Sequence, residues 1–210
     1  VHRKELSGVL SGLLRVIKIT QDDAHIFIAK EQLEDEIINV IRLFRKLLDK
    51  FNFKGVGFIG GEPFLVFEKL LDYLRKIRQR FGKGFYLWMY TNGDLINQDK
   101  LRKLKAAELD EIRFNISARG YDLRPVELAV NIINTVTLEI PAIPEDFEIV
   151  KKYLMKLQKI GVKHLHLHQL NATEYNYKNF SDRCYTFLHL PSIPIFESEI
   201  TALKLINYAI

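Results

Sequence analysis

The alternation of strand-like and helix-like segments is the feature that most constrains how this chain can fold. Short runs rich in β-branched and aromatic residues alternate with amphipathic helix patterns. Because strand–helix–strand crossovers are right-handed and place successive strands in parallel, this order predicts a parallel sheet with helices outside it. No glycine-rich dinucleotide fingerprint follows the first strand, so we predict an α/β fold, a partial (β/α)6 TIM-like barrel, rather than a doubly wound sheet. The predicted strands are residues 15–20, 55–59, 85–90, 111–117, 135–140 and 162–170.

Length and composition predict one globular domain. The chain has 210 residues, of which 48% are hydrophobic and 27% are charged, and this is enough apolar material for a sizeable core. We predict a single domain over residues 1–210, with a barrel core at about 15–170 and a C-terminal covering segment and helix at about 171–210. The many Lys, Glu, Ile and aromatic residues are typical of thermophilic proteins.

Charge, hydropathy and cysteine content narrow the partners and the compartment. The formal net charge is +5, but the basic residues are scattered among acids along helical patterns, which indicates solvated helix faces and argues against a nucleic-acid partner. No apolar run has the length of a membrane span and no cleavable signal is recognised, so we expect no membrane association and a cytoplasmic location. The single cysteine, Cys184, excludes an intrachain disulfide and any metal site built from cysteines alone.

The segment Gly60-Gly61-Glu62-Pro63 joins the second predicted strand to a helix. Two glycines allow a left-handed backbone or a close approach to a ligand, and Pro63 suits the first turn of a helix. Glu62 therefore stands at the carboxyl end of a parallel strand, where α/β proteins place their chemistry. On these residues alone, two interpretations are open: a tight turn with a solvated Glu62, or a binding segment.

Polar residues also follow the third and fourth predicted strands. Thr91-Asn92-Gly93 ends the third strand, and Ser117 and Arg119 end the fourth. Because the carboxyl ends of parallel strands meet at one edge, we expect these residues near Glu62. A guanidinium can bind a carboxylate through two hydrogen bonds, so Arg119 suits an anionic ligand group; a surface ion pair is the alternative.

Together these two motifs resemble those of radical S-adenosylmethionine enzymes. Gly60-Gly61-Glu62-Pro63 is similar to the GGEP motif of that family, and Thr91-Asn92-Gly93 is similar to its threonine-asparagine-glycine after strand three. The resemblance covers about residues 15–170 and implies S-adenosylmethionine as the cofactor. It implies that the GGEP segment contacts the methionine amino group and backbone, and that residues after strand four reach the ribose and the carboxylate. The candidate cofactor-binding residues are Gly60, Gly61, Glu62, Pro63, Thr91, Asn92, Ser117, Arg119 and His168.

The sequence departs from this family at the iron–sulfur cluster. The resemblance implies a [4Fe–4S] cluster held by three cysteines, spaced CxxxCxxC, after the first strand, yet no cysteine lies between Thr20 and Glu31. One explanation is that the protein has lost its cluster and become a binding or regulatory protein. The other is that the sequence is closed over a missing cluster loop at Thr20–Gln21. The abrupt change there from a strand to an acidic stretch favours the second explanation.

Three histidines alternate along the sixth predicted strand. His164, His166 and His168 face one side of the strand, while Leu165 and Leu167 face the other. A His-x-His pair is a common zinc device in barrel hydrolases, although the further ligands of that pattern are missing here. Two other interpretations are open: contact of His168 with cofactor or substrate near the barrel mouth, and a hydrogen-bonded interior layer.

The resemblance leads to a functional hypothesis. In such enzymes a reduced cluster cleaves S-adenosylmethionine to methionine and a 5′-deoxyadenosyl radical, which abstracts hydrogen from the substrate. This implies an oxidoreductase, transferase or lyase with an electron donor such as a ferredoxin or flavodoxin. The sequence identifies neither the substrate nor a catalytic residue. The alternatives are a cluster-less S-adenosylmethionine or nucleotide-binding module, and a metal-dependent hydrolase that uses the strand-six histidines.

Overall fold

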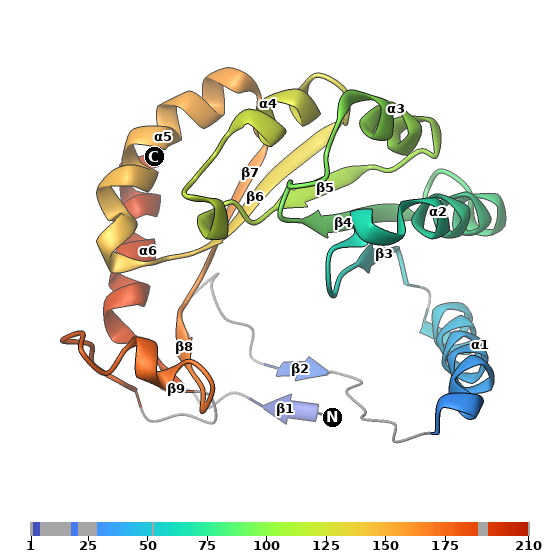
Figure 1. Ribbon diagram of the computed structural model, residues 1–210, viewed down its shortest axis with the longest axis horizontal. Helices are drawn as coiled ribbons and strands as arrows, with labels where there is room; N and C mark the ends of the chain where they lie inside the picture. Colours follow the sequence, from blue (N-terminus) through green and yellow to red (C-terminus); the bar gives the residue numbers. More distant parts are fainter. Residues whose placement is uncertain (1, 5–17, 21–28, 52, 189–192, 210) are drawn as a thin grey trace. The chain divides into compact units, whose positions relative to one another are not determined.

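A computed structural model shows the elements of the chain (Figure 1). The structure describes residues 2–4, 18–20, 29–51, 53–188 and 193–209. The chain divides into two compact units, 1–53 and 54–210. The single domain over residues 1–210 that the sequence indicated stays a prediction.

The N-terminal unit corrects the prediction for the first strand. Strand β1 (His2–Lys4) pairs with β2 (Lys18–Thr20) in antiparallel register. The strand predicted at 15–20 is therefore not part of the parallel sheet, because its described part bonds to β1 in a separate two-stranded sheet. Residues 15–17 lie outside the described residues.

The same unit contains one long helix. A short 3-10 turn, η3 (Lys30–Gln32), leads into helix α1 (Leu33–Phe51). Apolar residues recur at three- and four-residue spacing along this helix. Nineteen residues in one amphipathic pattern are enough for five turns of helix.

The second unit is built on a five-stranded parallel sheet with the order β3-β4-β5-β6-β7. Each strand is joined to the next through a helical segment, so strands that are consecutive in the chain are neighbours in the sheet. This confirms the α/β prediction, with five of the six predicted strands present in one sheet that is open among the described residues. The strands are β3 (Gly55–Phe58), β4 (Tyr86–Thr91), β5 (Glu111–Phe114), β6 (Thr135–Pro141) and β7 (His164–His168).

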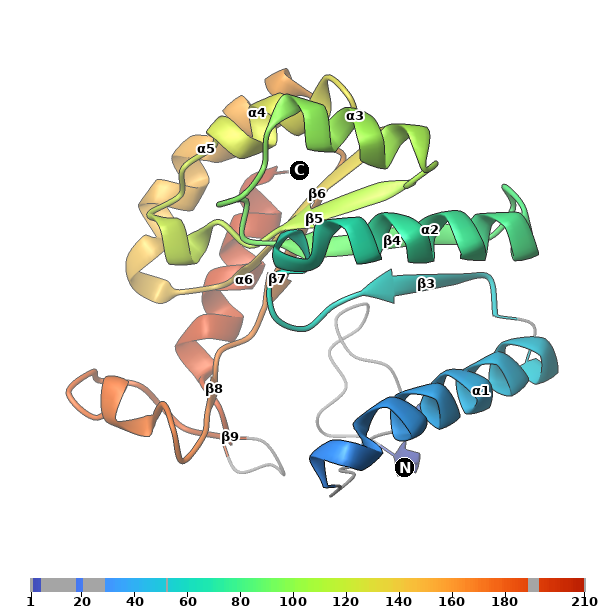
Figure 2. The same ribbon diagram turned by 45° about the vertical axis from the view of Figure 1, so that its right-hand side comes forward.

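Helices cover one side of this sheet, and α6 lies beside α5 (Figures 1 and 2). Their ends follow local signals: the Asn97 side chain accepts a hydrogen bond from Lys100 N at 2.8 Å, and Gly161 takes a left-handed φ of +97° after α5. Among the described residues, no helix combines the length and the apolar character that a membrane crossing requires. The helices are α2 (Phe67–Phe81), α3 (Gln98–Ala106), α4 (Arg124–Val130), α5 (Phe147–Ile160) and α6 (Phe196–Ala209).

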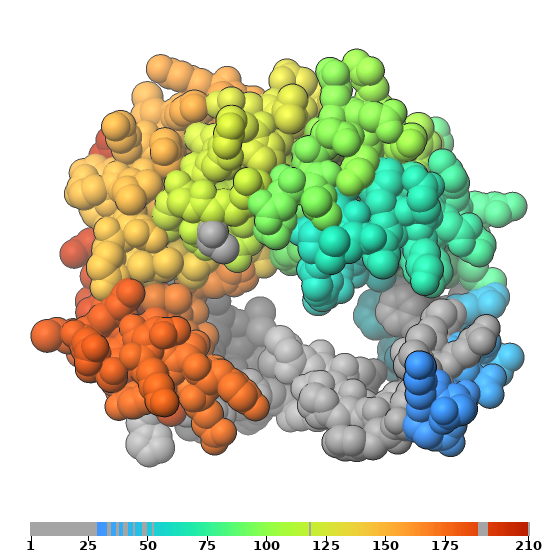
Figure 3. Space-filling model, viewed as in Figure 1, coloured from blue at the N-terminus to red at the C-terminus, as the bar shows by residue number. Residues whose placement is uncertain are grey.

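The hydrophobic core lies between the helices and the sheet. In β4, β5 and β6 every second residue faces the helices and is buried. In Figure 3 the teal, green and yellow residues of α2, α3 and α4 lie side by side on the surface. The buried strand residues include Leu87, Met89, Ile112, Phe114, Val136, Leu138 and Ile140. The opposite face of the same strands is polar and partly exposed. We call it the open face; it is formed by Trp88, Tyr90, Glu111, Arg113, Thr137, Glu139, His166 and His168.

The C-terminal segment after β7 has a small core of its own. Strands β8 (Asn171–Ala172) and β9 (Ile193–Pro194) pair in antiparallel register, and the buried side chains of Ala172, Phe180 and Ile195 pack together. Ser198 attaches helix α6 to the sheet, because its hydroxyl donates to Ala142 O at 2.7 Å and accepts from Leu170 N at 2.9 Å.

Candidate functional site

The turn after β3 has the backbone that its two glycines allow. Gly60 and Gly61 both adopt positive φ, +91° and +48°, a region that other residues rarely enter. A Cβ at either position would meet no atom within 4 Å, so the backbone conformation and not crowding requires glycine here. Pro63 stands in the first helical turn after the strand, as the sequence predicted: it begins the 3-10 turn η4 (Pro63–Val66), and it is buried.

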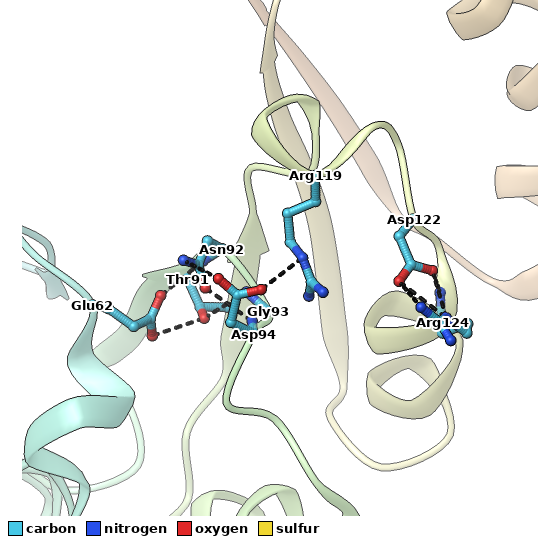
Figure 4. Close-up of polar contacts among 8 residues, drawn as sticks. All are labelled: Glu62, Thr91, Asn92, Gly93, Asp94, Arg119, Asp122 and Arg124. Carbon is cyan, nitrogen blue, oxygen red and sulfur yellow. Dashed lines mark hydrogen bonds and ion pairs between the residues drawn. The ribbon is translucent and has the colours of Figure 1, made fainter.

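Glu62 connects this turn to the end of the neighbouring strand (Figure 4). Its Oε1 accepts hydrogen bonds from Phe64 N at 3.1 Å and Thr91 Oγ1 at 2.9 Å. Its Oε2 accepts from Asn92 N at 2.9 Å. The carboxylate is therefore not a solvated side chain, because three donors from two adjacent strand ends hold it in place.

The turn after β4 is ordered by its own side chains. Thr91 is 4% exposed, and its hydroxyl accepts from Gly93 N at 3.0 Å while it donates to Glu62. The Asn92 side chain donates to Asp94 Oδ2 and accepts from Asp94 N, both at 2.9 Å. Gly93 has a φ of +85°, and a Cβ there would lie 2.9 Å from Pro125 Cβ, so both backbone and space require glycine.

Arg119 joins the network through a residue that sequence reasoning missed. Its Nε lies 2.7 Å from Asp94 Oδ1, so the ends of β3, β4 and β5 are linked in one polar chain (Figure 4). The signal for Asp94 was present, because Asn-Gly-Asp favours a turn in which short polar side chains bond to the backbone. Next to it, Arg124 hydrogen bonds to Asp122 and lowers the pKa of Asp122 to about 2.

The remaining two candidates lie outside this network. The Ser117 hydroxyl donates to Asn115 Oδ1 at 2.7 Å, at the end of β5. His168 ends β7, and its Nε2 lies 2.8 Å from Glu139 Oε1 on β6. The structure therefore brings together Glu62, Thr91, Asn92 and Arg119, whereas Ser117 and His168 bond to neighbours on or beside their own strands.

The cluster of the expected radical enzyme does not fit these residues. Such a cluster needs three thiolates, and residues 1–210 contain only Cys184, which is exposed and lies after β8. The Thr20–Gln21 junction lies outside the described residues, as does most of the segment where the cysteines were expected. Among the described residues, no group of three metal-binding side chains is placed to hold an ion, so the zinc hypothesis gains no support.

Comparison with known proteins gives two different relationships. Residues 1–107 match the family model of the tRNA synthetase class II core domain (G, H, P, S and T). Through these residues the chain belongs to that family. The chain is 63% identical over 63 residues to the threonine–tRNA ligase of Desulfovibrio desulfuricans, and 59% identical over 54 residues to that of Clostridium tetani. These matches cover 30% and 26% of this chain, and 10% and 8% of the ligases.

The second relationship is with a protein of Methanocaldococcus jannaschii that is provisionally named a glycyl-radical enzyme activating enzyme. The identity is 32% over 164 residues, which is 73% of this chain and 43% of the relative. A match of that extent necessarily includes the middle of the chain, where Gly60–Pro63 and Thr91–Asn92 lie. It supports the radical S-adenosylmethionine relationship that the motifs predicted.

The synthetase match also covers the segment where the cluster cysteines were expected. Residues 1–53 lie entirely within that match, and so do the GGEP motif at 60–63 and Thr91-Asn92-Gly93. The match therefore does not decide between cluster loss and a missing loop at Thr20–Gln21, and both stay hypotheses. The two matches overlap before residue 107, where the structure has the parallel strands β3 and β4.

Proposed function

We propose that residues 54–210 bind S-adenosylmethionine at the carboxyl ends of β3, β4 and β5, as the cofactor-binding part of a radical S-adenosylmethionine partial barrel. One observation carries the proposal: the Glu62 carboxylate joins the GGEP turn to Thr91 and Asn92 of the second motif. Two motifs that are separate in the sequence thus form one structural unit. The relative's name further supports a role connected with activation of a glycyl-radical enzyme.

The residues suit the amino-acid end of this cofactor. An ammonium needs several acceptors, and the Glu62 carboxylate lies beside two glycines whose positive φ angles shape the turn. The three donors that already hold Glu62 fix the direction of its remaining lone pair. Arg119 uses Nε for Asp94, so its two terminal nitrogens are the part that would bind the cofactor carboxylate.

The proposal covers binding and stops before the radical reaction. In radical S-adenosylmethionine enzymes the cluster supplies the electron that cleaves the sulfonium, and the single cysteine of residues 1–210 does not fit such a cluster. We therefore propose that residues 1–210 bind the cofactor without cleaving it reductively. Activation of a protein substrate with electrons from a donor would require three thiolates that are not among residues 1–210.

We assign no ligase activity to the synthetase-like segment. Its matches to threonine–tRNA ligases span 10% or less of the length of those relatives. The chain likewise spans less than half of the activating-enzyme relative. No contact in the described residues favours the hydrolase alternative.

Calorimetric titration of the full chain with S-adenosylmethionine tests the proposal. We expect saturable binding that Glu62→Gln weakens by about tenfold, because the neutral amide loses the charge that attracts the ammonium. Glu68→Gln is the matched control, since Glu68 is an exposed carboxylate in the first turn of α2. Methylthioadenosine lacks the ammonium and the carboxylate, so Glu62→Gln should leave its affinity unchanged.

Two results would contradict the proposal. The first is an absence of saturable binding by the unmodified chain. The second is equal weakening by Glu62→Gln and Glu68→Gln. Iron analysis after anaerobic reconstitution adds an independent check, because a single cysteine predicts no stable [4Fe–4S] cluster.

A further inference from the structure

The open face of the sheet contains a carboxylate that its neighbours do not fully neutralise. Glu139 on β6 is 11% exposed. Its Oε2 lies 3.3 Å from Arg113 Nη1 and 3.4 Å from His166 Nδ1, and its Oε1 lies 2.8 Å from His168 Nε2. Its shortest contact is therefore with an imidazole, which carries a positive charge only when it is protonated.

The nearby guanidinium is already bound to another carboxylate. Arg113 donates to both oxygens of Glu111, from Nε at 2.8 Å and from Nη2 at 3.2 Å. It also donates to Tyr90 Oη at 2.9 Å and stacks against the rings of Trp88 and Tyr90. Within the described part of the chain, Glu111 and Glu139 thus share one permanent positive charge, and Glu139 has the longer contact with it.

This excess negative charge is accessible from one side. The side chains of His166 and His168 are 45% and 54% exposed, while Glu111 beneath Arg113 is only 4% exposed. A positive group can therefore reach Glu139 past the two imidazoles but cannot reach Glu111. At reduced exposure the attraction between opposite charges is stronger than in bulk water.

The position of this group agrees with a binding role. In the sheet register Glu139 lies beside His166, and His168 lies at the carboxyl end of β7. That is the end of the sheet where parallel α/β proteins bind their ligands. His164 stacks on His166 with ring centroids 6.4 Å apart and extends the row toward the other end of the strand.

We propose that Glu139, His166 and His168 form a site for a basic side chain of a peptide substrate. The guanidinium or ammonium group binds to the Glu139 carboxylate, between the two imidazole rings. The peptide as ligand rests on the proposed function, because an activating enzyme acts on a protein. Cation binding is measured without S-adenosylmethionine, so either proposal can fail while the other holds.

Histidine NMR signals of the full chain provide the test. N-acetylarginine amide is titrated against the chain, with N-acetylcitrulline amide as a neutral probe of the same shape and N-acetylglutamate amide as an anionic one. We expect the arginine probe alone to shift the His166 and His168 resonances in a saturable way. The single substitutions His164→Asn, His166→Asn and His168→Asn assign the signals of these three residues among the six histidines of the chain.

Variants then locate the binding group. Glu139→Gln should weaken binding of the arginine probe by about tenfold or more, because the opposite charge is lost. His164→Asn is the matched control, because the His164 ring stacks on His166, whereas the imidazoles that contact Glu139 are those of His166 and His168. Fluorescence of Trp88, the single tryptophan, checks that each variant is folded.

Three results would overturn the proposal: equal binding of the arginine and citrulline probes, binding of the glutamate probe instead, or unchanged binding in Glu139→Gln. The comparison of arginine with citrulline uses the unmodified chain. It therefore decides the question even if Glu139→Gln does not fold.

Discussion

The two faces of the parallel sheet are formed by alternate residues of the same strands, yet different forces determine them. On the helix-covered face, Phe114 and Leu138 are fully buried among other apolar side chains. On the open face, Glu111 and Arg113 form an ion pair within β5, and Arg113 also contacts Tyr90 and Glu139 on the neighbouring strands. Alternation along a strand therefore separates a hydrophobic core from a charged surface within a single layer.

This difference shows how stability and binding are divided in the unit. Apolar burial is non-directional and depends mainly on the area removed from water. The contacts of the open face are directional and depend on one guanidinium that satisfies several partners. Substitutions that conserve volume should therefore cost little stability on the helix-covered face. On the open face, a change of charge should lower stability even where the shape of the side chain is kept.

The largest expected effect belongs to the helix-covered face. Phe114→Ala removes a fully buried ring and should lower the free energy of unfolding by about 4 kcal/mol, because it leaves a cavity as well as losing apolar burial. Urea unfolding followed by circular dichroism and by Trp88 fluorescence measures it. A loss below about 1 kcal/mol would show that this face is not the core.

Removal of the central charge tests the open face. Arg113→Met keeps an unbranched apolar stem but leaves Glu111 buried without its ion-pair partner, so we expect a loss of about 3 kcal/mol in the free energy of unfolding at neutral pH. The double variant Glu111→Gln with Arg113→Met should recover much of this loss. If the double variant is no more stable than the single one, the charge of Glu111 is not the cause.

The same ion pair predicts a dependence on pH. Burial raises the pKa of Glu111, but the hydrogen bonds from Arg113 and Thr137 outweigh burial, so the net pKa lies below its usual value. Its contribution to stability is therefore present above the usual carboxyl range and is lost as the pH falls through the lowered pKa. Unfolding curves between neutral and acid pH should be flatter for Glu111→Gln than for the unmodified chain.

Crowding on the open face gives a smaller effect. A Cβ at Gly57 would lie 2.3 Å from the indole nitrogen of Trp88, so Gly57→Ala must displace the ring and should cost about 2 kcal/mol of unfolding free energy. Gly84→Ala is the matched control, since a Cβ there would meet no atom within 4 Å. A shift of Trp88 emission in Gly57→Ala but not in Gly84→Ala would confirm the contact.

The smallest expected effect is local to one helix. Asn97→Ala removes the side-chain acceptor of Lys100 N and should lower the free energy of unfolding by about 1 kcal/mol. Asn97→Ser keeps a side-chain acceptor and should lower the free energy of unfolding much less. Equal losses in the two variants would contradict a capping role.

Several local features could be predicted from the sequence because they depend on residues close together in the chain. The left-handed backbone of Gly60 and Gly61, the buried Pro63 and the Asn97 cap all follow from the chemistry of a few adjacent residues. The order of the parallel strands followed in the same way, from periodicity and the rule for crossovers.

Features that depend on pairing between distant residues could not be predicted. Lys18–Thr20 had the composition of a strand, but its partner is His2–Lys4, and three residues of strand pattern do not specify a partner. The role of Asp94 required Arg119 to arrive from another strand end. The patterns of residues 1–107 also gave no sign of the similarity to the tRNA synthetase core domain, because helix and strand patterns are shared by unrelated proteins.

The positions of the turns, and the residues that reach the ends of the strands, follow from the amino-acid sequence, because backbone freedom and periodicity are local properties. The contacts that those residues make depend on the folded chain. The structure shows that Glu62 is held by three donors from two strand ends, and that Glu139 lies between an occupied guanidinium and two imidazoles. Hydrogen bonds and ion pairs depend on distances across the sheet, and these exist only after the strands have paired.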